Sequence, residues 1–278
     1  MIPPSFTYKR AGSVDEALAL AAEYGEDAKF LAGGHSLLPL MKLRFAAPEV
    51  LIDLGRIDGL SSITDRGTHV AIGALTRHHD VATSELLNAD IPLLAHTAAA
   101  IGDPQVRHRG TIGGSVAHGD AASDLPASLL ALEASFAVRG PGGTRTIPAR
   151  EFFHGIFETA LEPGELLTEV QVPKPANPSA WSFQKFTKRA IDWAIVGVAV
   201  QGAGASKTRV ALINMGPAPL RAAGVEQALE SGASPADAAA RAAEGTSAGT
   251  DIHASASYRE HLARVLVRRA LEESAARA

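Results

Sequence analysis

The sequence predicts an α+β protein built from two or three substructures. Its 278 residues exceed the usual size of a single domain. Short apolar runs typical of strands alternate with capped, amphipathic segments typical of helices. The proline-rich run Pro173–Pro178 stops both patterns and is the clearest linker. We therefore expect three units, over residues 1–55, 56–173 and 179–278.

The composition is that of a soluble globular protein and excludes several classes of function. The chain is 46% hydrophobic and 20% charged, and its formal net charge of -4 gives no field that would attract a nucleic acid. It has no cysteine, which excludes disulfides, thiolate nucleophiles and any iron–sulfur cluster bound by this chain alone. The N-terminus lacks the features of a secretion signal, and no stretch approaches about 18 consecutive apolar residues. We expect a cytoplasmic protein.

The first unit opens with a helix that carries its own boundary signals. Ser13 and Glu16 match a capping box, and the apolar spacing that follows predicts a helix over 14–24. Gly25 ends this helix. The rest of the unit is expected to hold a buried strand, a helical or turn segment and a second strand at Ala28–Leu31, Ser36–Leu43 and Val50–Leu54.

The second unit combines a half-buried strand, several helices and a hairpin. Asp124, with Pro126 two places on, opens one of the helices, and the run PGGT connects the strands of the hairpin. The expected elements are strand His69–Leu75, helices around Arg77–Leu87 and Pro92–Ile101, a helix from Asp124, hairpin strands Ser135–Val138 and Arg145–Pro148, and strand Leu166–Val172.

The third unit is predicted to be a small α+β domain. Its first half alternates in the manner of three antiparallel strands, and its second half has the apolar spacing of helices. The Ala- and Ser-rich part, 231–257, favours short helices and turns over disorder. The expected strands are Ala180–Phe186, Ala194–Gln201 and Arg209–Met215, and the expected helices are Ala222–Leu229, Pro235–Ala243 and Tyr258–Ala276.

Two glycine-rich segments of similar make are the strongest candidates for a binding site. Gly33-Gly34-His35-Ser36 and Gly113-Gly114-Ser115 each follow an apolar or basic stretch. Adjacent glycines let a ligand approach the backbone, whose N–H groups then form a concave anion site. One such segment is more often an ordinary tight turn, whereas two suit the two phosphates of a dinucleotide. Neither fits the Rossmann or the P-loop pattern, so we expect two separate half-sites.

With these residues in view, the chain resembles the FAD-binding medium subunits of the molybdenum hydroxylases, the xanthine dehydrogenase family. Within that family it is most similar to the medium subunits of aerobic carbon monoxide dehydrogenases. The resemblance covers essentially the whole chain. It is carried by MIPPSF, AGGHSLLPLMKLR with LIDLG, DPQVRHRGTIGGS, HGDAASDLPA, EPGELLTEVQVP and YREHLARVLVRRALE.

The resemblance implies a fold, a cofactor and partners. It implies a vanillyl-alcohol-oxidase or PCMH-type FAD-binding domain of two subdomains, 1–55 and 56–173, and a C-terminal flavoprotein domain over 179–278. FAD would be bound non-covalently. A small subunit would carry [2Fe-2S] clusters and a large subunit the molybdenum cofactor, in a dimer of heterotrimers. Electrons would leave FAD for a quinone, NAD or oxygen, and a quinone would bring the complex to the inner face of the membrane.

The resemblance also carries cofactor contacts over to numbered positions. Two segments would hold the pyrophosphate, Asp124 would make a polar contact, and Trp193 would lie beside the isoalloxazine ring. Ser115 stands where Asn is frequent, and Trp193 stands where relatives have Tyr. No catalytic or metal-binding residue is implied. The implied cofactor-binding residues are Ala32, Gly33, Gly34, His35, Ser36, Ile101, Thr111, Ile112, Gly113, Gly114, Ser115, Asp124, Leu167, Lys185 and Trp193.

Simpler roles remain open for several of these side chains. His35 could attach flavin covalently or donate to a phosphate, and its place in the glycine segment favours the donor. Asp124 could cap the helix that begins near Leu125, and the two roles can coexist. By default Lys185 would face solvent and Trp193 would pack in the core. His118 could touch the cofactor or lie on the surface.

His78 and His79 are adjacent, so a solvated helix face is favoured over a metal pair. Arg264, Arg268 and Arg269 favour a solvated helix face or a subunit contact.

Two other functions are compatible with the same residues. The first is a self-contained flavin oxidase or reductase, which the short segment after Val172 disfavours. The second is a nucleotide-binding regulatory module, which would leave Lys185 and Trp193 unexplained. Among substrates of a holoenzyme, carbon monoxide is favoured, and purines, N-heterocycles such as nicotine, and aldehydes remain open.

Overall fold

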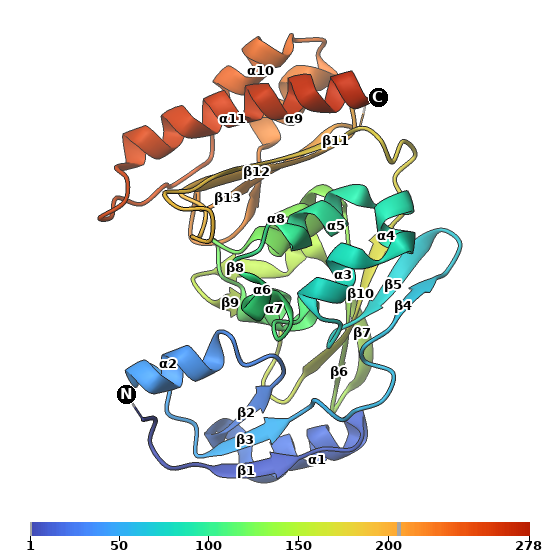
Figure 1. Ribbon diagram of the computed structural model, residues 1–278, viewed down its shortest axis with the longest axis vertical. Coiled ribbons are helices and arrows are strands. Elements are labelled where there is room, and N and C mark those ends of the chain that lie inside the picture. The colour runs from blue at the N-terminus through green and yellow to red at the C-terminus, as the bar shows by residue number, and fades with distance from the viewer. Residues whose placement is uncertain (1, 205–206) are drawn as a thin grey trace.

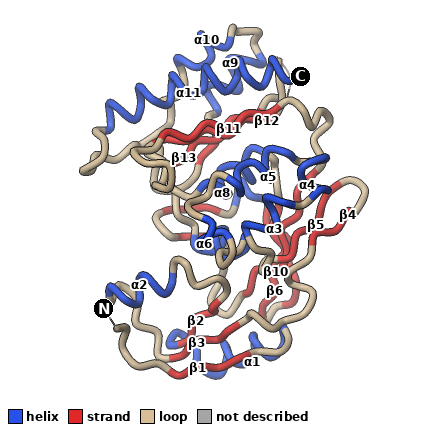
Figure 2. The backbone as a smooth tube through the Cα atoms, in the orientation of Figure 1, coloured by secondary structure: helices blue, strands red, loops and turns tan. Residues whose placement is uncertain are grey.

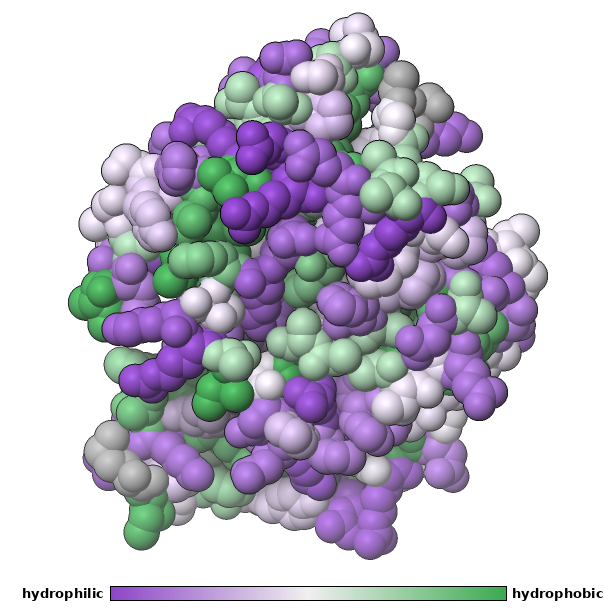
Figure 3. Space-filling view, turned by 45° about the horizontal axis from the view of Figure 1, so that its top comes forward, coloured by the Kyte–Doolittle hydropathy of each residue, from purple (hydrophilic) through white to green (hydrophobic). Residues whose placement is uncertain are grey.

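A computed structural model of the chain describes residues 2–204 and 207–278. Figure 1 shows three parts stacked along the long axis, with the N-terminal part at one end and the C-terminal part at the other. In Figure 2 loops, drawn in tan, make up much of the region where the N-terminal and middle parts face one another. Figure 3 shows polar side chains spread over the visible face, with apolar ones in small groups between them.

The N-terminal part is a parallel three-stranded sheet in the order β1-β3-β2. Helix α1 forms as predicted, because Ser13 Oγ accepts a hydrogen bond from Glu16 N at 3.1 Å and Gly25 ends the helix at φ 57°. The elements are β1 (Thr7–Arg10), α1 (Val14–Tyr24), a 3₁₀ turn (Gly25–Asp27), β2 (Ala28–Leu31), α2 (Leu37–Leu43) and β3 (Val50–Asp53).

Strand β2 differs from its prediction, since it is half-buried where a buried strand was expected. Lys29, Phe30 and Leu31 border a cavity, so part of this strand is not covered by protein. The apolar residues of the strand do not indicate this cavity. Strand β1 was not predicted. Its sequence, TYKR, lacks the alternation of apolar and polar residues that is typical of a strand. The segment is extended because it pairs with strand β3, which is distant in sequence.

The middle part is a five-stranded antiparallel sheet in the order β4-β5-β10-β6-β7, with helices packed against it (Figure 1). The predicted hairpin is confirmed. The strands are β4 (Ile63–Asp65), β5 (His69–Gly73), β6 (Ser135–Gly140), β7 (Gly143–Pro148) and β10 (Leu166–Pro173), with a small hairpin of β8 (Phe153–Gly155) and β9 (Glu158–Thr159) after a 3₁₀ turn (Ala149–Glu151).

Short helices fill the space between this sheet and the C-terminal part. The helix expected around Arg77–Leu87 is two helices, because Ser84 Oγ caps a new one by accepting from Leu87 N at 3.3 Å. The helices are α3 (His78–Thr83), α4 (Glu85–Asp90), α5 (Pro92–Ala99), α6 (Pro104–Arg107), α7 (Ile112–His118) and α8 (Asp124–Ala131).

The C-terminal part is an antiparallel sheet in the order β11-β12-β13-β14. Three strands were expected, and the fourth is a two-residue strand, Leu220–Arg221, between prolines and a helix start. The remaining elements are β11 (Trp181–Phe186), β12 (Val196–Gln201), β13 (Arg209–Ile213), α9 (Ala223–Glu230), α10 (Pro235–Ala240) and α11 (Ala256–Arg277).

Both faces of the C-terminal sheet are covered, which joins it to the middle part. Val198 and Val200 face the core under α9, α10 and α11. Ala199 and Ala211 face the core that includes α5 and α8. Strand β12 is accordingly buried along its whole length. Among the described residues, no helix is long and apolar enough to cross a membrane.

Candidate functional site

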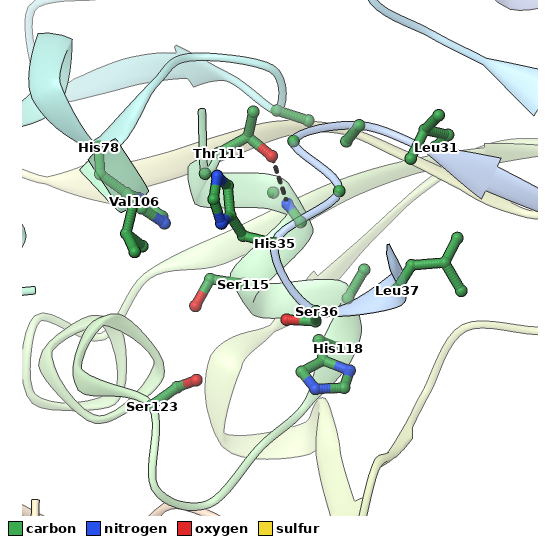
Figure 4. Close-up of a pocket in the computed structure, with 18 of the residues that line it drawn as sticks. Leu31, His35, Ser36, Leu37, His78, Val106, Thr111, Ser115, His118 and Ser123 are labelled. Atoms are coloured by element: carbon green, nitrogen blue, oxygen red, sulfur yellow. Dashed lines mark hydrogen bonds between the residues drawn. The ribbon is translucent and has the colours of Figure 1, made fainter. Parts of the chain in front are cut away.

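A cavity of about 910 Å³ lies where the three parts of the chain meet. Its walls come from residues 29–54 of the N-terminal part, 74–167 of the middle part and 185–193 of the C-terminal part. Figure 4 shows loops and helix ends converging on it. This volume falls within the range of about 300–1,000 Å³ that is typical of cofactor and ligand sites.

The first glycine segment, Ala32–Ser36, connects β2 to α2 and forms one wall. Gly34 adopts φ +76°, a conformation that favours glycine. A Cβ on Gly33 would collide with the carbonyl oxygen of Arg109, so this segment lies directly on the backbone that leads to α7. These glycines are therefore required by the packing and the backbone conformation of the protein itself.

The second glycine segment, Thr111–Ser115, is a helix start and not the loop that was expected. Thr111 is the N-cap of α7, and its Oγ1 accepts a hydrogen bond from Gly114 N at 3.1 Å, the dashed line in Figure 4. A Cβ on Gly113 would lie 2.5 Å from Ala74 Cβ, which explains the glycine inside a helix. The two segments meet, since a Cβ on Gly114 would lie 3.8 Å from Ala32 Cβ.

The structure brings the predicted cofactor residues together around this cavity, with one exception. Ile112 is not among the lining residues, because its side chain is fully buried in the core of the middle part and its N–H donates to Thr76 O at 3.0 Å. The predicted residues that line the cavity are Ala32, Gly33, Gly34, His35, Ser36, Ile101, Thr111, Gly113, Gly114, Ser115, Asp124, Leu167, Lys185 and Trp193.

Asp124 and Lys185 form an ion pair in the cavity wall. Lys185 Nζ donates to Asp124 Oδ2 at 2.7 Å and to Ala100 O at 3.2 Å. Burial raises the pKa of Asp124 to about 6, and the attraction of Lys185 only partly offsets it. Lys185 thus points into the cavity wall with its side chain 11% exposed, contrary to the default of a solvent-facing residue. Asp124 is the first residue of α8, whereas Ser123 occupies the cap position.

The second oxygen of Asp124 lacks a partner within the described part of the protein. Within residues 2–204 and 207–278, buried Oδ1 has no hydrogen-bond partner. An unpaired buried acceptor is costly. Asp124, a residue that the resemblance indicates, thus has incomplete hydrogen bonding in the cavity wall.

His78 also lines the cavity, which the sequence did not reveal. The expectation of a solvated face is wrong for His78, which is 6% exposed, while His79 stacks on His108 with ring centroids 4.2 Å apart. Burial lowers the pKa of His78 to about 4. Its ring lies against Gly110, where a Cβ would come within 2.6 Å of Nε2. The one feature of the sequence that could have indicated burial of His78 is the apolar run that ends three residues before it, at Leu75.

His35 lies in the first glycine segment, where Figure 4 shows its ring near His78 and Thr111. Burial lowers the pKa of His35, and the positive charge of Arg109 lowers it further. The ring is therefore neutral at physiological pH and can donate one hydrogen bond. This property fits the role of a donor near an anion.

Apolar side chains from two separate loops border the cavity. Trp193 and Ile191 follow β11 and are each 59% exposed, so Trp193 is not the core residue expected by default. Phe157, between β8 and β9, stacks on His118 at 4.8 Å between centroids, and both line the cavity. Flat side chains of this kind suit an aromatic ring system.

The cavity has both polar and apolar walls. It offers the backbone of the first glycine segment, polar side chains from both segments and apolar side chains at its edge. The backbone N–H groups of residues 112–115 donate to Thr76, Ala74 and Thr111 within the protein. The described part of the chain contains no cluster of three or more His, Asp or Glu suited to a metal ion.

Family models match nearly all of the chain. Residues 4–175 match the model described as FAD binding domain in molybdopterin dehydrogenase. Residues 181–274 match the model described as CO dehydrogenase flavoprotein C-terminal domain.

Individual proteins match over the full length. The carbon monoxide dehydrogenase medium chain of Hydrogenophaga pseudoflava is 45% identical over 285 residues, covering 100% of this chain and 99% of the relative. Subunit alpha of the 6-hydroxypseudooxynicotine dehydrogenase complex of Paenarthrobacter nicotinovorans is 40% identical, covering 100% and 97%. A solved structure of carbon monoxide dehydrogenase from Hydrogenophaga pseudoflava superposes with a TM-score of 0.95 at 45% identity, covering 100% of both chains.

Proposed function

Because this chain belongs to the family of FAD-binding subunits of molybdopterin dehydrogenases, we propose that it carries electrons through FAD within a molybdenum-containing hydroxylase. It is an oxidoreductase subunit, and the resemblance found in the sequence is confirmed. The observation that supports the proposal best is the coincidence of a full-length match to medium chains with a cavity bordered by both glycine segments.

The residues of the cavity fit FAD. The first glycine segment, His35 and the hydroxyl group of Ser115 offer donors to a pyrophosphate. Asp124, whose Oδ1 is unpaired among the described residues, is the proposed polar contact in the wall. Trp193 and Phe157 offer flat apolar surface to the ring system. Leu167 and Ile101 complete the proposed contacts, whereas Ile112 supports the segment from the core.

When bound, FAD supplies the redox chemistry, taking up electrons from iron–sulfur clusters and passing them to an acceptor. The chain orients the cofactor and shields it. Lys185 places a positive charge in the wall, which favours negative charge nearby. His35 contributes a ring N–H that can donate to an anion.

The clusters and the molybdenum cofactor belong to partner subunits, in agreement with the absence of cysteine from this sequence. We propose a small iron–sulfur and a large molybdenum subunit in a dimer of heterotrimers. A quinone is the proposed acceptor, which would bring the complex to the inner face of the membrane. We also propose the division into FAD-binding subdomains 1–55 and 56–173 and a C-terminal flavoprotein domain, 179–278.

Carbon monoxide is the proposed substrate of the holoenzyme, since medium chains of carbon monoxide dehydrogenase are among the most similar relatives. The family also includes subunits of nicotine, caffeine and aldehyde dehydrogenases. The substrate pocket lies on the large subunit, so this chain's cavity does not select among these substrates.

Purification of the tagged chain from its own host tests the proposal. We expect two further chains to co-purify, with iron, molybdenum and FAD in the complex, and expect oxidation of carbon monoxide. Activity on a purine, an N-heterocycle or an aldehyde would overturn only the proposed substrate and leave the electron-transfer role unchanged. A chain that carries flavin without partners and oxidises a substrate itself would overturn the proposal in favour of a stand-alone flavin enzyme.

A further inference from the structure

Asn214, which directly follows β13, connects two walls of the cavity that come from different parts of the chain. Its backbone N–H donates to Ala121 O at 2.8 Å. Its side-chain Nδ2 donates to Ala194 O at 2.9 Å and to Ile195 O at 3.4 Å. One residue therefore contacts the α7–α8 connection and the segment directly after Trp193.

The conformation of Asn214 suits this double role. Its φ is 61°, in the left-handed region that asparagine enters several-fold more readily than most residues. The chain leaves the sheet at this point, between buried Ile213 and buried Met215. The left-handed turn thus lets the backbone N–H and the side-chain amide bond to different segments at once.

Each of the two segments held by Asn214 borders the cavity. Ala121 lies two residues before Ser123 and three before Asp124, and both of these line the cavity. Ala194 is buried and directly follows Trp193, which lines the cavity from the other part. Beside the direct bond from Lys185 to Asp124, Asn214 thus gives a second hydrogen-bond connection between these walls, from the segment before Asp124 to the residue after Trp193.

Trp193 depends on backbone anchors because its own side chain is mostly exposed. The loop from Phe186 to Ile195 is closed by a hydrogen bond from Ile195 N to Phe186 O at 2.8 Å. Arg259, which is 2% exposed, donates to Ile195 O. Within the described residues, these bonds and the one from Asn214 Nδ2 hold the end of the loop next to the indole.

We propose that Asn214 is a positioning residue that fixes the Trp193 indole relative to the Asp124 wall, and thereby its contact with a bound flavin ring. The first half concerns this chain alone, and only the contact with flavin rests on the proposed function. No local sequence pattern indicates this role, because Asn214 lies 20 residues from Ala194 and is remote from Ala121.

The test uses the fluorescence of Trp193, which becomes the only tryptophan when Trp181→Phe is introduced, since the sequence has two. In that background Asn214→Gly keeps the backbone donor and tolerates the positive φ, and it removes only the amide. We expect the fluorescence anisotropy of Trp193 to fall in the flavin-free protein. Asn214→Asp keeps the preference for this turn but sets a carboxylate against two carbonyls, so it should give the same loss.

Asn88→Ala is the matched control, because Asn88 Nδ2 also donates to two carbonyls, Ala82 O and Ser84 O, far from Trp193 in sequence. This control should lower stability and leave the anisotropy of Trp193 unchanged. Unchanged anisotropy in both Asn214 variants would overturn the proposal, and so would an equal loss in the Asn88 variant.

A second measurement uses the emission of the flavin. In the complex with FAD, Asn214→Gly should reduce the quenching of flavin emission by the indole, and it should have no such effect in a Trp193→Phe background. An equal change in both backgrounds would overturn the proposal. Absence of flavin from every variant would instead refute the proposed function, while the anisotropy result would still decide the role of Asn214.

Discussion

Burial of ionisable side chains in the cavity wall is the main feature at the scale of single residues. Burial lowers the pKa of His78 to about 4 and raises that of Asp124 to about 6. Each group is thereby shifted towards its neutral form. A site of this kind has consequences for stability against pH that can be measured without any ligand.

Replacing His78 by Gln should change the pH dependence of stability. The folded pKa of His78, about 4, lies below the reference value of 6.5, so its contribution to stability is full above pH 6.5 and is lost as the pH falls through about 4. The shift corresponds to about 3 kcal/mol at about 1.4 kcal/mol per pKa unit. We expect urea unfolding to show that the free energy of unfolding of His78→Gln falls less than that of the wild type as the pH is lowered. An equal fall in both proteins would contradict the burial of His78.

A matched pair of glycine variants separates backbone strain from the role of the cavity. Gly34 and Gly59 have φ of +76° and +83°, and only Gly34 lines the cavity. Alanine at either position should cost about 1 kcal/mol of backbone strain, and at Gly34 its Cβ would also press on Leu38 Cδ1 at 2.9 Å, so the Gly34 variant should lose more stability. We expect only Gly34→Ala to weaken FAD retention, measured as the flavin-to-protein absorbance ratio. Equal retention by both variants would show that the first glycine segment does not hold the cofactor.

Sequence reasoning reached residues whose type or resemblance singled them out. The glycine pairs, Asp124 and Lys185 were named from their pattern or from the resemblance, and the structure brings them to one cavity. His78 and Asn214 were missed because their importance depends on contacts with Gly110 and with Ala121 and Ala194, which are remote in sequence. No local pattern encodes such contacts.

At the scale of elements, the ion pair between Lys185 and Asp124 connects strand β11 to helix α8. It is deeply buried, with side-chain exposures of 11% and 7%. Such a pair stabilises a fold less than its distance suggests, because desolvation offsets the attraction. Losing one partner is nevertheless costly, since the other charge stays buried.

Lys185→Met should therefore destabilise the chain by about 3–5 kcal/mol. The double variant Lys185→Met with Asp124→Leu should recover part of that loss, because no charge remains buried. Arg139→Met is the control, since its pair with Asp15 is 42% and 75% exposed and should be worth less than about 1 kcal/mol. Denaturant unfolding of the four proteins measures this, and a double variant no more stable than Lys185→Met alone would contradict the account.

Long elements with caps and regular apolar spacing were predicted well, and short ones were not. Helix α1 and hairpin β6–β7 follow local rules and form as expected. Strands β1 and β14 are short, and pairing with other strands defines them. Helix α7 was missed because its first turn contains two glycines, which are poor helix formers, and close packing against Ala74 is the compensating factor.

At the scale of the whole molecule, the site exists only because three parts of the chain come together. The N-terminal part supplies the first glycine segment, the middle part supplies α7 and Asp124, and the C-terminal part supplies Lys185 and Trp193. The α+β class and the need for two half-sites could be predicted from sequence. The position of the third part over the cavity could not, since it depends on packing of α5 and α8 against the C-terminal sheet.

The central claim is that this shared cavity holds FAD without a covalent bond. The most direct measurement is an absorption spectrum of the protein, purified in the complex it forms in its host, before and after acid precipitation. We predict bands near about 370 and 450 nm, with the colour released into the supernatant as FAD. Colour retained in the pellet would contradict non-covalent binding, and a protein that carries no flavin even after incubation with FAD would contradict the claim as a whole.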